Sequence, residues 1–221
     1  RNQPERNLRG YAGQTVAKIE TLNNIDLAAL PRFTSNINEL DRVLGGGIVP
    51  GSAILIGGSP GAGKSTLLLQ VMCHLAAQRS ALYVTGEESL QQVAMRAQRL
   101  SLPNDKLSML AETSVETICE LALTLKPQIM VIDSIQVMHV ADVASAPGSV
   151  SQVRESAAYL TRFAKQHHIA MFLVGHVTKD GSLAGPKVLE HCIDCSMMLE
   201  GESDSRYRTL RSQKNRFGAV N

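Results

Sequence analysis

The chain has 221 residues, of which 44% are hydrophobic and 19% are charged, and its formal net charge is +2. These values allow one α/β domain with a sizeable core and exclude a disordered chain. No apolar run reaches the length of a bilayer span, and no charged-then-apolar leader opens the sequence. We therefore expect a protein of the cytoplasm without a membrane partner.

Residues 1–30 are polar and weakly patterned, and they predict a linker or arm with one short strand near Val16–Ile19. The folded domain is expected over residues 31–221. It opens with a short helix for which Thr34 or Ser35 is the expected cap.

Short apolar segments then alternate with helical segments. The expected strands cover residues 52–57, 81–85, 107–110, 128–133 and 170–174. The expected helices cover residues 64–79, 90–100, 115–125 and 150–166. Two further strand-like segments follow at 195–199 and 207–212. This order predicts an α/β fold with a central, mostly parallel twisted sheet flanked by helices and a strand-rich C-terminal end.

A glycine-rich segment fits the phosphate-binding loop pattern G-x-x-x-x-G-K-[ST] and stands between an expected strand and an expected helix. Its glycines let backbone N–H groups turn toward phosphate oxygens, and the helix amino terminus adds partial positive charge. We expect Lys64 to reach the β- and γ-phosphates of ATP and Ser65 to bind Mg²⁺. The alternative is a turn that only links strand to helix. The expected ATP- or ADP-binding residues are Gly58, Ser59, Pro60, Gly61, Ala62, Gly63, Lys64, Ser65 and Thr66.

Residues 57–61 also match the nucleophile elbow G-x-S-x-G, with Asp133 and His176 following in the order that α/β-hydrolases use. In that fold the residue after the serine donates its backbone N–H to the oxyanion hole. Here that residue is Pro60, which has no N–H. The sequence therefore excludes a hydrolase triad.

Three polar positions at the ends of expected strands are candidates for the chemistry. Asp133 ends an apolar strand and is expected to hold Mg²⁺ together with Ser65, the alternative being a turn cap. Glu87 is the candidate that orients and deprotonates the attacking water, whereas Glu88 fits the start of a helix. His176 is a candidate sensor of the γ-phosphate.

Six segments together resemble the bacterial RadA (Sms) family of RecA-like DNA-repair ATPases: LDRVLGGGIVPGS, GGSPGAGKST, YVTGEES, VIDSIQ, GHVTKDG and KNRFG. The similarity runs from about Tyr11 onward, and KNRFG is a signature of that family. It implies a RecA-like P-loop NTPase core that assembles as a hexameric ring with nucleotide between subunits. It also implies a DNA-stimulated ATPase motor that promotes branch migration, with single-stranded DNA, recombination intermediates and the recombinase RecA as partners.

The resemblance also implies roles for particular residues. Glu87 matches the catalytic glutamate, and Lys214 and Arg216 of KNRFG would reach the γ-phosphate of the neighbouring subunit. Two DNA-facing loops match residues 139–151 and 178–187.

The second loop carries Lys179 and Lys187, which we expect to hold DNA phosphates by charge. Either loop is alternatively an ordinary surface connection. Family members also carry an amino-terminal zinc finger and a carboxy-terminal Lon-protease-like domain. Neither is recognised in these residues, so we expect an ATPase core.

Two other functions share the phosphate loop. A small-molecule kinase is disfavoured by the basic run that ends in KNRFG, because a kinase has no use for a group aimed at a neighbour. A nucleotide-gated assembly module of the KaiC type, without DNA, remains the alternative. Cys192 and Cys195 form a single C-x-x-C pair, for which we favour two buried thiols over a zinc site.

Overall fold

The computed structural model describes residues 17–26, 31–59, 63–176, 189–201 and 209–217. Its sheet has seven strands in the order β3-β2-β4-β5-β1-β6-β7. The strands are β1 (Ala53–Gly58), β2 (Ala81–Thr85), β3 (Ser108–Ala111), β4 (Ile129–Asp133), β5 (Ala170–His176), β6 (Cys195–Glu200) and β7 (Thr209–Asn215). The helices are α1 (Asn38–Val43), α2 (Lys64–Leu75), α3 (Leu90–Arg99), α4 (Val115–Leu125) and α5 (Val150–Gln166), with short 3₁₀ turns η1 (Leu22–Asn24) and η2 (Ile135–Val137).

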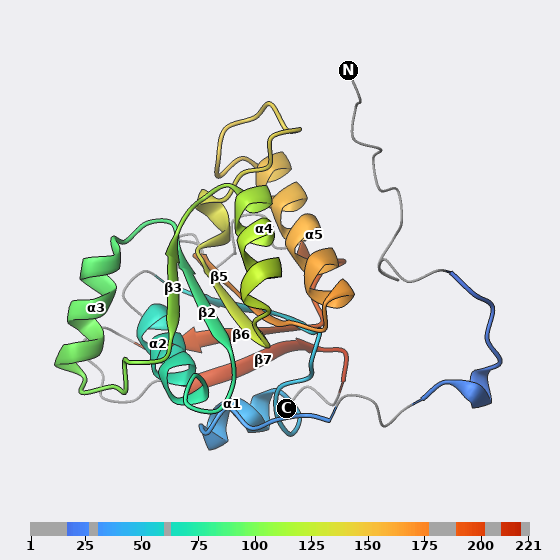
Figure 1. Ribbon diagram of the computed structural model, residues 1–221, viewed down its shortest axis with the longest axis horizontal. Helices are drawn as coiled ribbons and strands as arrows, with labels where there is room; N and C mark the ends of the chain where they lie inside the picture. The colour runs from blue at the N-terminus through green and yellow to red at the C-terminus, as the bar shows by residue number, and fades with distance from the viewer. Residues whose placement is uncertain (1–16, 27–30, 60–62, 177–188, 202–208, 218–221) are drawn as a thin grey trace.

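Every neighbouring pair of strands from β3 to β6 is parallel, and only β6 and β7 run antiparallel. This confirms the expected mostly parallel sheet and its strand-rich C-terminal end. The helices cover both faces: α4 and α5 lie on one side, and α1, α2 and α3 lie on the other (Figure 1).

Alternate residues of each central strand enter two separate cores. In β1, Ile54 and Ile56 pack on the side of α1, α2 and α3, whereas Ala53 and Leu55 pack on the side of α4 and α5. All of β1, β2 and β4 is buried. A strand covered on both faces has no polar face, which explains why these segments are continuous apolar runs rather than alternating ones.

The first helix departs from its predicted capping. Thr34 and Ser35 do not cap it; α1 begins after Ile37, with no side chain bonded to its free N–H groups. Both hydroxyls donate instead to the Asp41 carboxylate, Ser35 at 2.6 Å. A hydroxyl that donates to a nearby carboxylate makes a stronger, charge-assisted bond than one that accepts from a backbone amide.

The predicted strand near Val16–Ile19 is wrong where the structure describes it, since residues 17–20 pair with no strand. In Figure 1 the segment 17–26 runs clear of the body, and its large apolar side chains are exposed. Helix α2 also ends at Leu75, four residues before the predicted Arg79, and gives way to a turn. Within the described residues, no helix is long and apolar enough to cross a membrane.

Candidate nucleotide-binding site

The parallel sheet gathers four polar strand ends at one edge. Gly58 at the end of β1 lies opposite His176 at the end of β5, and Thr85 of β2 lies opposite Asp133 of β4. Because β2, β4, β5 and β1 are consecutive in the sheet, these ends form one continuous row. This is the edge at which open α/β sheets bind ligands.

The glycine-rich loop leaves this edge from β1 and enters α2. Gly63 precedes α2 with φ of 91°, a left-handed conformation that favours glycine. A Cβ on Gly58 would lie 2.9 Å from the carbonyl oxygen of Leu199, so no side chain fits there. Ser59 is exposed and Thr66 lies in the first turn of α2. Pro60, Gly61 and Ala62 lie outside the described residues.

Lys64 folds back onto the loop. Its ammonium group donates to the carbonyl oxygens of Gly58 at 2.6 Å and Ser59 at 3.1 Å. Only 4% of the residue is exposed. Burial lowers the pKa of Lys64, and the nearby carboxylates of Asp133 and Glu87 oppose that effect. The loop thus places a cation beside two carboxylates at the point where phosphates are expected.

Asp133 receives two hydroxyl hydrogen bonds on a single oxygen. Ser65 Oγ and Tyr83 Oη each donate to Asp133 Oδ2 at 2.6 Å. Burial and the adjacent carboxylate raise the pKa of Tyr83 well above its ordinary value, so this phenol stays protonated and keeps donating. Hard oxygen donors from Ser65 and Asp133, already in contact, fit a site for Mg²⁺.

Glu87 lies in the turn after β2. Its Oε1 accepts a hydrogen bond from Ser134 Oγ at 2.8 Å and lies 3.3 Å from His176 Nε2. The side chain is 42% exposed. Glu88 points elsewhere and forms an ion pair with Arg96.

Glu88 was predicted to open the following helix, and it lies just outside it. Helix α3 begins at Leu90 behind Ser89, whose hydroxyl accepts from the Gln92 backbone in a capping box. The structure therefore separates the two glutamates: Glu87 lies near the phosphate loop lysine, and Glu88 forms an ion pair with Arg96 of α3.

Lys214 and Arg216 lie away from their own phosphate loop. Arg216 pairs with Asp194 at 2.8 Å, and Asp194 accepts from the backbone N–H of Ala53 at the start of β1. The loop leaves the other end of this six-residue strand, about 17 Å away at the usual rise per residue. Lys214 donates to the carbonyl oxygen of Glu190.

The two predicted DNA loops are described unequally. Lys179 and Lys187 of the second loop lie outside the described residues. The first loop, residues 139–151, is held by buried Gln152, which binds the backbone of Val140, Val143 and Ser145. Residues 139–151 contain no lysine or arginine, so this loop offers DNA phosphates no permanently positive side chain.

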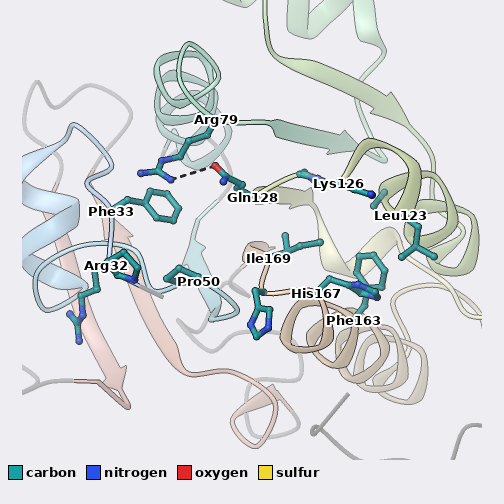
Figure 2. A pocket seen from close by; sticks show the side chains of 14 residues that line it. Arg32, Phe33, Pro50, Arg79, Leu123, Lys126, Gln128, Phe163, His167 and Ile169 are labelled. Carbon is teal, nitrogen blue, oxygen red and sulfur yellow. Dashed lines mark hydrogen bonds between the residues drawn. The ribbon is translucent and has the colours of Figure 1, made fainter. Parts of the chain in front are cut away.

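A hollow of about 630 Å³ lies at the opposite edge of the sheet (Figure 2). Pro50, Gln128 and Ile169 line it, and each comes just before a strand of the parallel sheet. Arg79 stacks over Phe33 at its wall. The hollow is therefore separate from the phosphate loop.

Cys192 and Cys195 are both buried, as expected. Burial raises the pKa of the Cys195 thiol to about 11, which keeps it neutral near pH 7. Across the described parts of the chain, no group of three or more metal-capable side chains is found.

Two residues outside the sequence-predicted set, Tyr83 and Ser134, also belong to the site. Tyr83 is a polar side chain in the middle of the otherwise apolar run ALYV, and Ser134 directly follows Asp133. A hydroxyl in a fully buried strand needs a partner, which is the signal that points to Tyr83. Ser134 carries no comparable signal, because its contact depends on how the Glu87 turn docks.

A glycine-rich loop between β1 and α2, with its lysine, serine and strand-end aspartate at the carboxyl edge of a parallel α/β sheet, defines a P-loop NTPase of the RecA-like class. A family model described as "AAA domain" matches residues 26–182. The chain belongs to this family.

Curated relatives give a more specific similarity. The chain is 75% identical over 212 residues to the DNA repair protein RadA of Haemophilus influenzae, covering 96% of this chain and 46% of that protein. It is 71% identical over 215 residues to the Escherichia coli RadA, covering 97% and 47%, and 49% identical over 212 residues to the Bacillus subtilis RadA, covering 96% and 46%. The resemblance to RadA is confirmed. The chain spans about half the length of these relatives.

A solved structure supports the fold. The KaiC-like protein of Pyrococcus horikoshii superposes with a TM-score of 0.71, covering 87% of this chain and 92% of that one. At 18% sequence identity this likeness concerns the fold alone.

Proposed function

We propose that this domain binds MgATP at the carboxyl edge of its sheet and hydrolyses the γ-phosphate. The observation that carries the proposal is the convergence there of Lys64, Ser65, Asp133 and Glu87 from three separate segments of the chain. The sequence similarity to RadA proteins supports the same activity.

Each of these residues has a distinct task in the proposed reaction. Lys64 exchanges its contacts with loop carbonyls for contacts with phosphate oxygens, while Ser65 and Asp133 hold Mg²⁺. When bound, the metal neutralises charge on the β- and γ-phosphates. Glu87 orients the attacking water and accepts its proton. His176, beside the same carboxylate oxygen, senses whether a γ-phosphate is present.

The proposal extends to DNA through the relatives, which are named as DNA repair proteins. We propose that nucleotide hydrolysis is stimulated by single-stranded DNA and drives branch migration on recombination intermediates together with the recombinase RecA, in the cytoplasm. Lys179 and Lys187 supply charge for DNA phosphates, so binding is independent of sequence.

Lys214 and Arg216 are proposed to act on the nucleotide of a neighbouring subunit in a hexameric ring. Their position supports this role, since Arg216 pairs with Asp194 at the start of β1, whereas the phosphate loop of the same subunit follows the other end of that strand. A guanidinium supplied by a neighbour stabilises the spread charge of the transition state and ties hydrolysis to assembly.

The decisive experiment measures steady-state ATP hydrolysis by the full-length protein with and without single-stranded DNA. Lys64→Ala should lose nucleotide binding or turnover, and Glu87→Gln should bind ATP but hydrolyse it about 100-fold more slowly or worse. Glu88→Gln is the matched control, because Glu88 binds Arg96 instead of facing the site, and its turnover should stay within about twofold of wild type. Equal losses in both glutamate variants would contradict the assignment.

The DNA arm of the experiment separates the two ATPase functions. Stimulation by single-stranded DNA is the expected result. Hydrolysis that does not respond to DNA would contradict the motor and favour a nucleotide-gated assembly module.

A further inference from the structure

We propose that Ser134 is a positioning residue that aims the Glu87 carboxylate at the attacking water. Through Ser134, the chain segment that carries the metal-site aspartate also orients the catalytic glutamate. The inference rests on the proposed hydrolytic function. Its starting observation is the hydrogen bond of 2.8 Å from Ser134 Oγ to Glu87 Oε1.

The backbone under Glu87 is held firmly. The N–H of Gly86 donates to the carbonyl oxygen of Asp133 at 2.9 Å. A Cβ on Gly86 would lie 2.5 Å from Val137 Cγ2, so the turn is pressed against the segment that follows β4. The hydroxyl of Thr85 spans the turn, donating to the Glu88 carbonyl and accepting from the Glu88 N–H. The Cα of Glu87 therefore has a fixed place.

The side chain of Glu87 needs an anchor of its own. It is 42% exposed, and a glutamate with this freedom samples many rotamers. Within the described residues, its hydrogen-bond partners are Ser134 and His176, and both meet Oε1. Ser134 is fully buried, whereas the His176 side chain is 34% exposed and its contact is longer at 3.3 Å.

Ser134 is thus the rigid partner, and among the described residues this arrangement leaves Oε2 of Glu87 for the water. A carboxylate held by one oxygen can present the other in a constant direction. The residue before Ser134 is Asp133, whose own carboxylate is clasped by Ser65 and Tyr83. Two consecutive residues therefore set the metal ligand and the catalytic base relative to each other.

The test uses full-length Ser134→Ala protein, with ATP affinity, kcat and KM measured separately. We expect kcat to fall about 10- to 100-fold while the affinity for ATP stays within about twofold, because the hydroxyl touches the base and not the phosphates. Ser134→Thr, which keeps the hydroxyl, should recover most of the lost kcat. Ser156→Ala is the control, since Ser156 is an equally buried serine on α5 whose hydroxyl has no partner in the described part of the protein.

If the alanine variant fails to fold, Ser134→Cys replaces it, because a thiol occupies the same position, although it is somewhat larger than the hydroxyl, and donates weakly. An unchanged kcat in a folded Ser134 variant would overturn the inference. So would a fall in ATP affinity that matches the fall in kcat, or a threonine variant that folds but recovers nothing, since each indicates a purely structural role. A wild-type protein that hydrolyses no ATP would refute the proposed function itself, which is a distinguishable result.

Discussion

Removal of the Tyr83 hydroxyl tests how Asp133, the proposed metal ligand, is held. Tyr83→Phe deletes the bond from Tyr83 Oη to Asp133 Oδ2, which is 2.6 Å long and fully buried, and leaves the ring in place. A hydrogen bond to a charged group contributes about 1.5 to 3 kcal/mol to stability. In a domain of this size that loss lowers the melting temperature by about 3 to 12 °C.

The same change loosens Asp133, the proposed metal ligand, since among the described residues only Ser65 then donates to its carboxylate. Losses of this kind cost about 10-fold or more in metal affinity. We therefore expect Tyr83→Phe to need about 10-fold more Mg²⁺ for half-maximal ATP binding.

The assays are thermal unfolding followed by circular dichroism, and ATP binding titrated against magnesium. Tyr159→Phe is the control, because Tyr159 is a half-buried tyrosine on α5 whose hydroxyl has no hydrogen bond among the described residues, although the carboxylates of Glu116 and Asp142 lie near it. A Tyr83→Phe protein as stable as the control, with an unchanged magnesium requirement, would refute the reasoning. The bond would then contribute nothing beyond what water offers the unfolded chain.

Two further predictions concern the buried thiol of Cys119 and the proposed ring of subunits. Burial raises the pKa of Cys119 from its ordinary 9.0 to about 12, so the unfolded chain loses this proton first and stability falls as pH rises above 9. Cys119→Ala should remove up to about 1.4 kcal/mol per pH unit of that fall, visible as a shallower slope in urea unfolding between pH 9 and 12; an identical slope would contradict it. Full-length Glu87→Gln subunits mixed with Arg216→Ala subunits should recover part of the ATPase activity that each lacks alone, because both lesions can then fall at one shared interface. No recovery in confirmed mixed assemblies would argue that Arg216 acts within its own subunit.

Local patterns of the sequence were enough to predict most of the fold. Apolar runs such as QIMVID and SAILIG predict strands buried on both faces. The structure has a hydrophobic core on each face of the sheet, so both sets of alternating side chains in these strands are apolar. The clustering of Lys64, Ser65 and Asp133 could be predicted because a fixed loop pattern and a strand end place them at the same edge.

Contacts between distant segments could not be predicted in this way. The bonds from Ser134 to Glu87 and from Tyr83 to Asp133 join residues 47 and 50 positions apart, and each depends on the final register of the sheet. The capping of α1 failed for a related reason: Asp41 competes for the hydroxyls of Thr34 and Ser35, and residue spacing does not reveal which partner wins.

The three contacts of Asp194 have a mechanical consequence for β1. The buried Asp194 carboxylate accepts hydrogen bonds from the backbone at the start of β1, from Lys165 near the end of α5, and from Arg216. It therefore links these three parts of the protein. In the proposed ring, a force on Arg216 from a neighbouring subunit would act through Asp194 on the start of β1, whose other end leads into the phosphate loop. Strand β1 therefore runs from the proposed contact with a neighbouring subunit to the proposed nucleotide site.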